Sequence, residues 1–186
     1  MSEENKTKFE VQKVLRENIL AGLKALGIDA AKYTVMEAGQ TPPTSKGDVI
    51  LFKMETSGQI GWQAAKMRVV GATGSRRLTR SDEFIDHQEW LIVVLRHRRT
   101  DDTITTMQSE DVARCLISWF NGRGCEFFRQ HGMANTNIRE NPVNLYKSTS
   151  DVYERSSSFK LKLQVPKAIV SPQDEAYMKY AGNVLV

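Results

Sequence analysis

Hydrophobic residues near the N-terminus recur at steps of three and four, which is the spacing of one face of a helix. The members of this stripe are Val11, Val14, Leu15, Ile19, Leu23 and Leu26. Thr7 and Glu10 have capping-box spacing, in which two side chains satisfy backbone N–H groups at the start of a helix. Gly27 follows the stripe, as expected at a helix C-terminus. The pattern therefore predicts a helix between Thr7 and Gly27.

Two short apolar runs in the middle of the chain predict strands. The first lies within Asp48–Glu55. The second, Glu89–Arg96, is apolar at consecutive positions, which is typical of a central strand covered on both faces. Between the two runs, glycines interrupt residues 56–83 and the pattern fades. We expect a long loop there, with a further strand at residues 64–70 as an alternative.

The second half of the chain predicts one more helix and a hairpin. The helix spans Ser109–Phe120 and carries an apolar stripe, which consists of Val112, Cys115, Leu116, Trp119 and Phe120. Asn144–Ser148 is expected to form one arm of the hairpin. The other arm is Phe159–Val165, in which apolar and polar residues alternate. Pro166 is expected to end this strand.

This order of elements predicts the fold class. The succession α-β-(β)-β-α-β-β gives an α+β fold, a mostly antiparallel central sheet with helices packed on it. A chain of 186 residues fits one domain with one hydrophobic core. We assign residues 1–166 to this domain. Residues 167–186 are expected to form a C-terminal tail that docks on its own or on a neighbouring subunit.

Composition narrows the class of protein further. The shares of hydrophobic residues (40%) and charged residues (26%) indicate a folded chain rather than a disordered one. No apolar run approaches the roughly 20 residues that cross a bilayer. The N-terminal segment is acidic and polar, unlike a secretory signal. We therefore expect a protein that is kept in a cytoplasm without membrane contact, with Cys115 and Cys125 as reduced thiols.

The sequence carries no motif that indicates catalysis or cofactor binding. His87, His97 and His131 are scattered and lack the spacing of metal ligands. A Gly-x-Ser-x-Gly nucleophile turn is absent, and residues 71–74 are too short for a phosphate-binding loop. We expect no catalytic site, no metal and no cofactor. An enzyme whose site assembles from scattered residues stays an alternative.

Basic residues gather at two places. One cluster consists of Arg76, Arg77 and Arg80 in the expected loop, and the other of Arg96, Arg98 and Arg99 at the end of the central strand. Acidic neighbours favour an ordinary solvated surface, and the alternative is a charged rim that contacts an acidic subunit or passing DNA. The net charge of +4 is too small to indicate nucleic acid by itself. No aromatic residue lies among the arginines, so stacking of bases is not indicated.

The second half of the chain shows an order of elements that is known from one family. A central strand is followed by a polar turn, a helix, a short segment and a hairpin, which here are Glu89–Arg96, Ser109–Phe120, Ile138–Pro142 and the residues up to Val165. In the hairpin, Tyr153 and Arg155 precede the alternating strand. This order resembles the tail or neck terminator proteins of tailed phages. The N-terminal helix and the Pro42–Pro43 turn fit as well, so the likeness covers residues 9–166.

The resemblance implies assembly rather than catalysis. Such terminators form a hexameric ring on the last ring of the tail tube, stop its growth and join the tail to the head connector, and in contractile tails they engage the sheath. Genomic DNA passes through the ring, and the protein resides in the tail or neck of the virion. A ring requires two different contact patches on each subunit. We expect these around Tyr153 and Arg155 and around Arg76–Arg80, in contacts between subunits or with the tube.

Two further functions stay open from the sequence. One is another tail-completion or tube-associated protein, from which the residues do not distinguish a terminator. The other is a small basic nucleic-acid-binding protein that uses the arginine clusters, and its affinity for DNA would fall steeply with salt.

Overall fold

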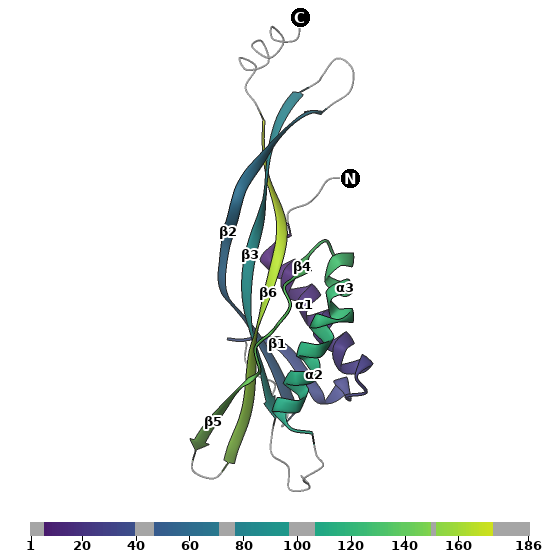
Figure 1. Cartoon of the computed structure of the whole chain (residues 1–186), viewed down its shortest axis with the longest axis vertical. Helices are drawn as coiled ribbons and strands as arrows, with labels where there is room; N and C mark the ends of the chain where they lie inside the picture. Colours follow the sequence, from purple (N-terminus) through teal and green to yellow (C-terminus); the bar gives the residue numbers. More distant parts are fainter. Residues whose placement is uncertain (1–5, 40–46, 71–76, 97–106, 150–151, 173–186) are drawn as a thin grey trace, which may run out of the picture.

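The computed structural model describes residues 6–39, 47–70, 77–96, 107–149 and 152–172. It shows three helices packed on a mixed, mostly antiparallel sheet of six strands in a single domain, which confirms the predicted α+β class (Figure 1). The helices are α1 (Lys8–Ala25), α2 (Ser109–Asn121) and α3 (Arg123–Gln130), with a 3₁₀ turn at Ala30–Lys32. The strands are β1 (Tyr33–Glu37), β2 (Asp48–Val70), β3 (Arg77–Arg96), β4 (Ala134–Asn135), β5 (Val143–Thr149) and β6 (Val152–Pro172).

Helix α1 begins and ends as predicted. The Thr7 hydroxyl accepts a hydrogen bond from the Glu10 backbone N–H at 3.2 Å, and the Glu10 carboxylate accepts one from the Thr7 backbone N–H at 2.6 Å. Gly27 adopts a φ of +71°, a conformation that glycine tolerates best. The predicted stripe is buried except for Leu26, which is the C-cap residue and is 38% exposed.

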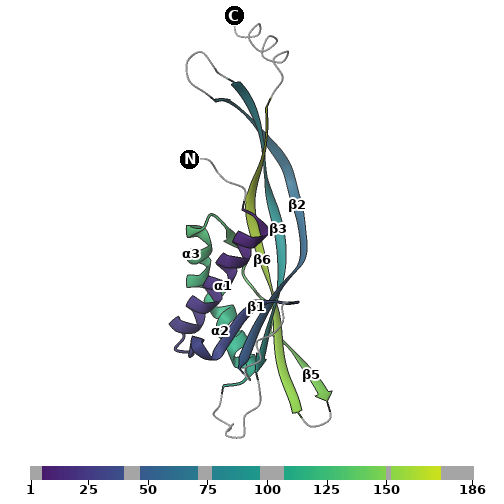
Figure 2. The same ribbon diagram turned by 180° about the vertical axis from the view of Figure 1, so that it is seen from behind.

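The sheet is built on three long strands. The order across the sheet is β1-β2-β3-β6-β4, and β5 also pairs with β6. Only β1 and β2 run parallel. β3 lies between β2 and β6, so the prediction of a central strand at Glu89–Arg96 is confirmed. The three long strands run side by side through the length of the molecule, and the β5–β6 hairpin lies at one end of it (Figure 2).

The long loop expected at residues 56–83 is wrong, because most of this segment is strand. β2 and β3 pair along their length, from Val49 with Leu95 to Val70 with Arg77. Residues 71–76 between the two strands lie outside the described part. Two register shifts, at residues 54–56 and 60–64, interrupt the pairing. Such bulges let a strand hold extra residues, so the glycine-broken pattern remains compatible with pairing. The alternative strand at residues 64–70 is the far end of β2.

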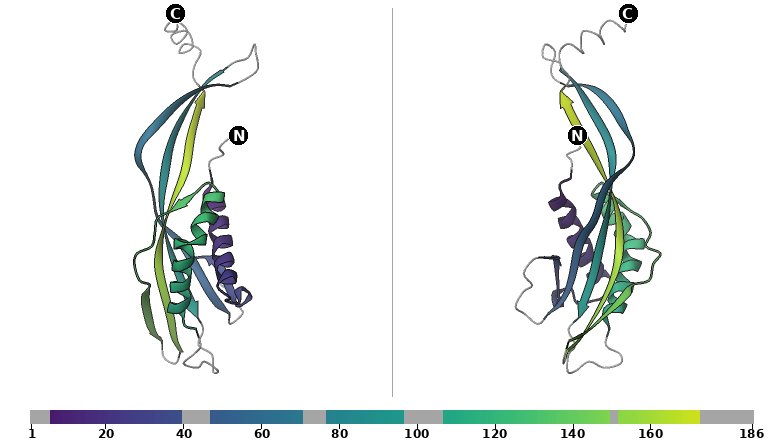
Figure 3. Two further views of the ribbon diagram at one scale, coloured as in Figure 1. Left: turned by 45° about the vertical axis from the view of Figure 1, so that its right-hand side comes forward. Right: turned by 90° about the vertical axis from the view of Figure 1, so that its left-hand side faces the viewer.

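The helices cover only one face of the sheet (Figure 3). On that face Trp90, Ile92 and Val94 of β3 are fully buried in the core. The neighbouring Leu91 and Val93 lie on the opposite face and are partly exposed. The prediction that β3 is covered on both faces is therefore wrong within the described residues. The opposite face has no helix layer above it there.

A buried amide and an indole ring hold the three helices together. Asn18 of α1 is fully buried, and its side chain donates a hydrogen bond to the Gly124 carbonyl at 3.0 Å. Trp119 of α2 donates its indole N–H to the Asn18 Oδ1 at 2.7 Å. The ring packs directly against Gly22 and Gly124, where a Cβ atom would lie within 3.0 Å of it. Asn18 of α1 is thus hydrogen-bonded to one residue of α2 and one residue of α3.

The hairpin near the C-terminus differs from the prediction. β5 pairs with residues 152–158, whereas Phe159–Val165 pairs with β3 and, at two positions, with β4. β6 continues through Pro166 to Pro172, so the predicted strand end at Pro166 is wrong. Pro166 lies beyond the two positions at which β4 pairs with β6, so one edge of β6 is unpaired there in the described part, and proline is tolerated in edge strands. Residues 173–186 lie outside it.

Candidate functional site

The three long strands extend past the helices as a bare sheet, which we call the arm. It comprises residues 59–70, 77–86 and 165–172 and forms the upper half of the view in Figure 1. Gln59, Ile85 and Pro166 are exposed, with Ile85 at 43%. No described helix covers most of the arm, although Val165 at its base is buried in the core, and a narrow sheet needs a hydrophobic face or a helix packed on it for independent stability. The arm is therefore the part of the described chain most in need of a partner.

The structure separates the two arginine clusters. Arg77 and Arg80 lie where β3 begins, at the far end of the arm, and Arg96 is the last residue of the same strand. At the usual rise per residue the two ends of β3 are roughly 60 Å apart. Arg77 and Arg80 therefore do not share one local patch with Arg96. Arg76, Arg98 and Arg99 lie outside the described residues.

Arg155 lies next to Arg96 in the sheet and also belongs to the β5–β6 hairpin. The two residues are partners in the register of β3 and β6, and Tyr146 of β5 is the partner of Arg155 on its other side. Tyr153 pairs with Ser148, at the end of the β5–β6 hairpin. The hairpin end of the sheet therefore gathers Arg96, Arg155 and Tyr153 away from the arm.

A buried polar network lies where the arm joins the part of the sheet that the helices cover. The sequence did not suggest this network. The Asp86 carboxylate, which is 3% exposed, accepts hydrogen bonds from Ser57 at 2.9 Å and Gln88 at 2.8 Å and pairs with the Lys167 ammonium at 2.7 Å. Gln88 in turn accepts the indole N–H of Trp90 at 3.1 Å. Burial by itself raises the pKa of Asp86, but these hydrogen bonds outweigh it and lower the pKa. The network ties β2, β3 and β6 together.

An ion-pair belt crosses the helix-free face of the same strands. The Lys160 ammonium lies 2.9 Å from the Glu55 carboxylate and 2.7 Å from that of Glu89, and Lys162 lies 3.7 Å from Glu89. Two carboxylates around one ammonium raise the pKa of Lys160, and the hydrogen bond from Lys160 lowers the pKa of Glu89. These four charges compensate one another within the chain.

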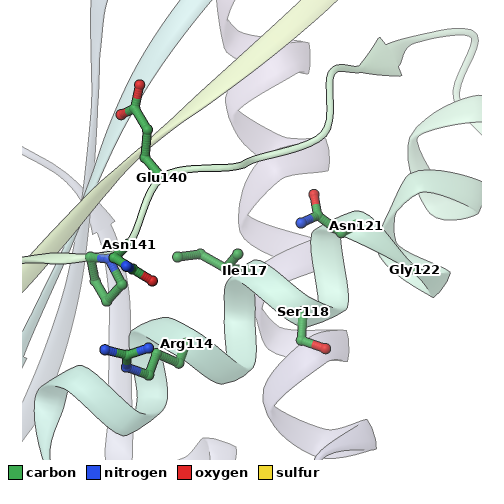
Figure 4. Close-up of a pocket in the computed structure, with 8 residues that line it drawn as sticks. Arg114, Ile117, Ser118, Asn121, Gly122, Glu140 and Asn141 are labelled. Carbon is green, nitrogen blue, oxygen red and sulfur yellow. The ribbon is translucent and has the colours of Figure 1, made fainter.

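A shallow groove of about 540 Å³ lies between α2 and the segment that leads to β5 (Figure 4). It is lined by Arg114, Ile117, Ser118, Asn121, Gly122, Glu140, Asn141 and Pro142. Two of its polar side chains, Asn121 and Arg114, have structural partners. The Asn121 side chain donates to the Ile138 carbonyl at 2.9 Å and accepts from its N–H at 2.8 Å, and Arg114 pairs with Glu110 at 2.7 Å. The groove thus serves to anchor the connecting segment.

The candidate chemical groups of the sequence do not come together in the described part of the chain. Cys115 and Cys125 are both unbridged and partly exposed. His131 stacks on Phe127, with ring centroids 4.8 Å apart. No group of three or more His, Cys, Asp or Glu side chains is placed there to hold a metal ion. None of the described helices has the length and apolar character to cross a membrane.

Comparison with known proteins does not assign the chain to a family. No protein-family model matches the chain. No curated protein matches it significantly either. The function is therefore argued from the arm, the sheet faces and the element order alone.

Proposed function

We propose that this chain is a structural phage protein of the tail-terminator type, which assembles into a six-membered ring. The ring caps the tail tube, stops its growth and joins the tail to the head connector, with genomic DNA passing through it. In a contractile tail it also contacts the sheath. The role is one of assembly, without a catalytic step or a cofactor.

The observation that carries this proposal is the arm. A sheet that leaves its own helix layer and exposes Ile85 and Pro166 offers more surface than one subunit covers. The arm and the hairpin with Arg155 and Tyr153 lie at opposite ends of the sheet. Two different patches at opposite ends are what a head-to-tail contact needs, and repetition of such a contact gives a ring when the rotation between neighbours closes. The element order of the second half supports the same family.

Native mass spectrometry across a range of concentrations, with negative-stain images of the same samples, tests the proposal. A species of six subunits that appears as a ring with a central hole is the expected result. Purified tail tubes then provide the second test, because a terminator binds their ends and stops further growth. A chain that neither assembles nor binds tube ends would refute the proposal. A protein that binds tubes along their length would instead be another tube-associated component.

The far end of the arm favours nucleic acid as a second candidate partner. Residues 66–70, 77–81 and 170–172 contain four basic residues, Lys66, Arg68, Arg77 and Arg80, and no acidic residue. If they contact phosphates, replacing all four with Gln makes the plot of the logarithm of the DNA-binding constant against the logarithm of the salt concentration less steep, by roughly 3–4 in slope. Fluorescence anisotropy with a random duplex measures this slope. A variant with four Gln in the helix layer (replacing Lys24, Arg114, Arg123 and Arg129) is the matched control.

A further inference from the structure

Asn121 and Gly122 form the one Asn-Gly pair of the sequence. Asparagine loses its side-chain amide most easily before glycine, because glycine places no side chain beside the backbone nitrogen that attacks. The pair stands at the end of α2, where both residues are exposed and line the groove (Figure 4). Water therefore reaches the position at which the sequence most favours deamidation.

Deamidation at this pair needs only water and base. The deprotonated backbone nitrogen of Gly122 attacks Cγ of Asn121 and forms a C–N bond. The bond from Cγ to the side-chain nitrogen breaks, and this nitrogen leaves as ammonia with the proton that the backbone nitrogen gave up. Water then opens the five-membered imide. Opening at the side-chain carbonyl gives aspartate, and opening at the main-chain carbonyl gives isoaspartate, so both products carry a carboxylate.

The fold holds both reacting groups in other contacts. The Gly122 N–H donates to the Trp119 carbonyl at 3.0 Å. The Asn121 amide donates to the Ile138 carbonyl at 2.9 Å, and its oxygen accepts the Ile138 N–H at 2.8 Å. Ring closure requires the nitrogen to approach Cγ in a reactive geometry. These three hydrogen bonds must therefore open before the reaction can occur.

The Asn121 side chain also fastens the connecting segment, residues 138–142, to α2. Asparagine suits this role because its amide offers a donor and an acceptor to the two backbone groups of Ile138. A carboxylate retains the acceptor but has no donor, so a charged oxygen would face the Ile138 carbonyl. Isoaspartate also adds a methylene group to the main chain. Either product thus fastens the segment less firmly, immediately before β5 begins at Val143.

We propose that Asn121–Gly122 is a site of spontaneous deamidation that is protected by the connecting segment and that holds the segment open once modified. In the closed state, the bonds to Ile138 keep Asn121 from reacting. A local opening lets the imide form, and the carboxylate product then cannot restore both bonds. The site therefore converts a transient opening next to β5 into a lasting one. This inference concerns one subunit and does not depend on the proposed ring.

Peptide mapping by mass spectrometry, after incubation in mildly alkaline buffer, measures the reaction. The folded wild type should deamidate at Asn121 at least about tenfold more slowly than the same chain unfolded in urea, because hydrogen bonds must open first. Asn137 is also exposed but precedes a branched residue, so it is the internal control and should react far more slowly than Asn121 in urea. Equal rates at Asn121 in the folded and unfolded chain overturn the protection.

Ile138→Ala separates local opening from global unfolding. The Ile138 side chain packs against the core, so its truncation loosens the segment without changing Asn121, Gly122 or the backbone groups that bind them. The folded variant should deamidate roughly three- to tenfold faster than the wild type. Thr7→Ala removes the distant cap of α1 instead and should leave the rate unchanged. Equal acceleration by both variants, or none by Ile138→Ala, overturns the proposed local opening.

Asn121→Asp tests the effect of the modification on the segment. Hydrogen exchange followed by mass spectrometry should be about fivefold faster at residues 136–142 than in the wild type, as expected for the loss of one hydrogen bond. Exchange in α1 should not change. An unchanged rate at residues 136–142 would show that the carboxylate fastens the segment as well as the amide does, and would overturn the lasting opening.

Discussion

Gly22 occupies the place in α1 where two effects of a methyl group oppose each other. Alanine is a better helix former than glycine, by about 0.8–1.0 kcal/mol in a helix interior. A Cβ at this position would, however, lie 2.7 Å from Cδ1 and 2.9 Å from Cγ of Trp119. These contacts are shorter than packed carbon atoms allow. Gly22→Ala therefore combines a gain in helix propensity with a steric clash between the new Cβ and the Trp119 ring.

The cost of the clash should exceed the gain in helix propensity because the Trp119 ring has little room to move. Its indole N–H is bound to the buried Asn18, and Gly124 contacts it closely as well. Overpacking of a well-packed core costs about 1–3 kcal/mol, and a fixed aromatic ring favours the upper part of that range. After subtraction of the helix-propensity gain, we expect Gly22→Ala to lower the free energy of unfolding by about 1–2 kcal/mol.

Urea unfolding followed by circular dichroism measures this loss, and in a thermal scan it corresponds to a midpoint about 2–8 °C lower. The same substitution in a Trp119→Leu background is the control. Without the indole the clash is removed, so Gly22→Ala should be neutral or stabilising there, and the two substitutions should couple by at least about 1 kcal/mol. An alanine that stabilises the wild-type background would show that the packing argument is wrong.

Three further predictions follow from the described contacts. Thr7→Ala removes the capping box and should lower the free energy of unfolding by about 1 kcal/mol in a urea titration, whereas Thr7→Ser should largely preserve it. Asp86→Asn should cost about 1–3 kcal/mol, because a buried carboxylate with three donors is lost, and Lys167→Met should cost less because Lys167 is partly exposed. The pKa of Asp86 is lowered in the folded state, so its contribution is complete above about pH 4 and disappears as the pH falls through that lowered value. Unfolding free energies of the wild type and Asp86→Asn should therefore converge in acid, and a constant difference would contradict this origin.

Local signals in the sequence were sufficient for α1 and α2 and for parts of the long strands, but they did not predict α3, β1 or β4. The capping box at Thr7 and the glycine at Gly27 define α1 because they act on the backbone within a few residues. The apolar run within β3 and the alternation of Phe159–Val165 likewise predicted strand. Their neighbours in the sheet were not predicted, because pairing depends on residues far away in the chain. Hence the hairpin partner of β5 was assigned wrongly.

The sequence by itself determined the α+β class, the first helix and the central position of β3. Only the tertiary structure decided that residues 56–83 form most of an extended hairpin, because long-range backbone pairing overrides a pattern broken by glycines. It also separated Arg77 from Arg96 along one strand and placed Arg155 beside Arg96. Asp86 carried no local signal, since its burial arises only where Ser57 and Lys167 arrive from two other strands. The exposed sheet face is a tertiary property for the same reason: β3 is apolar on both faces, and the helices cover only one.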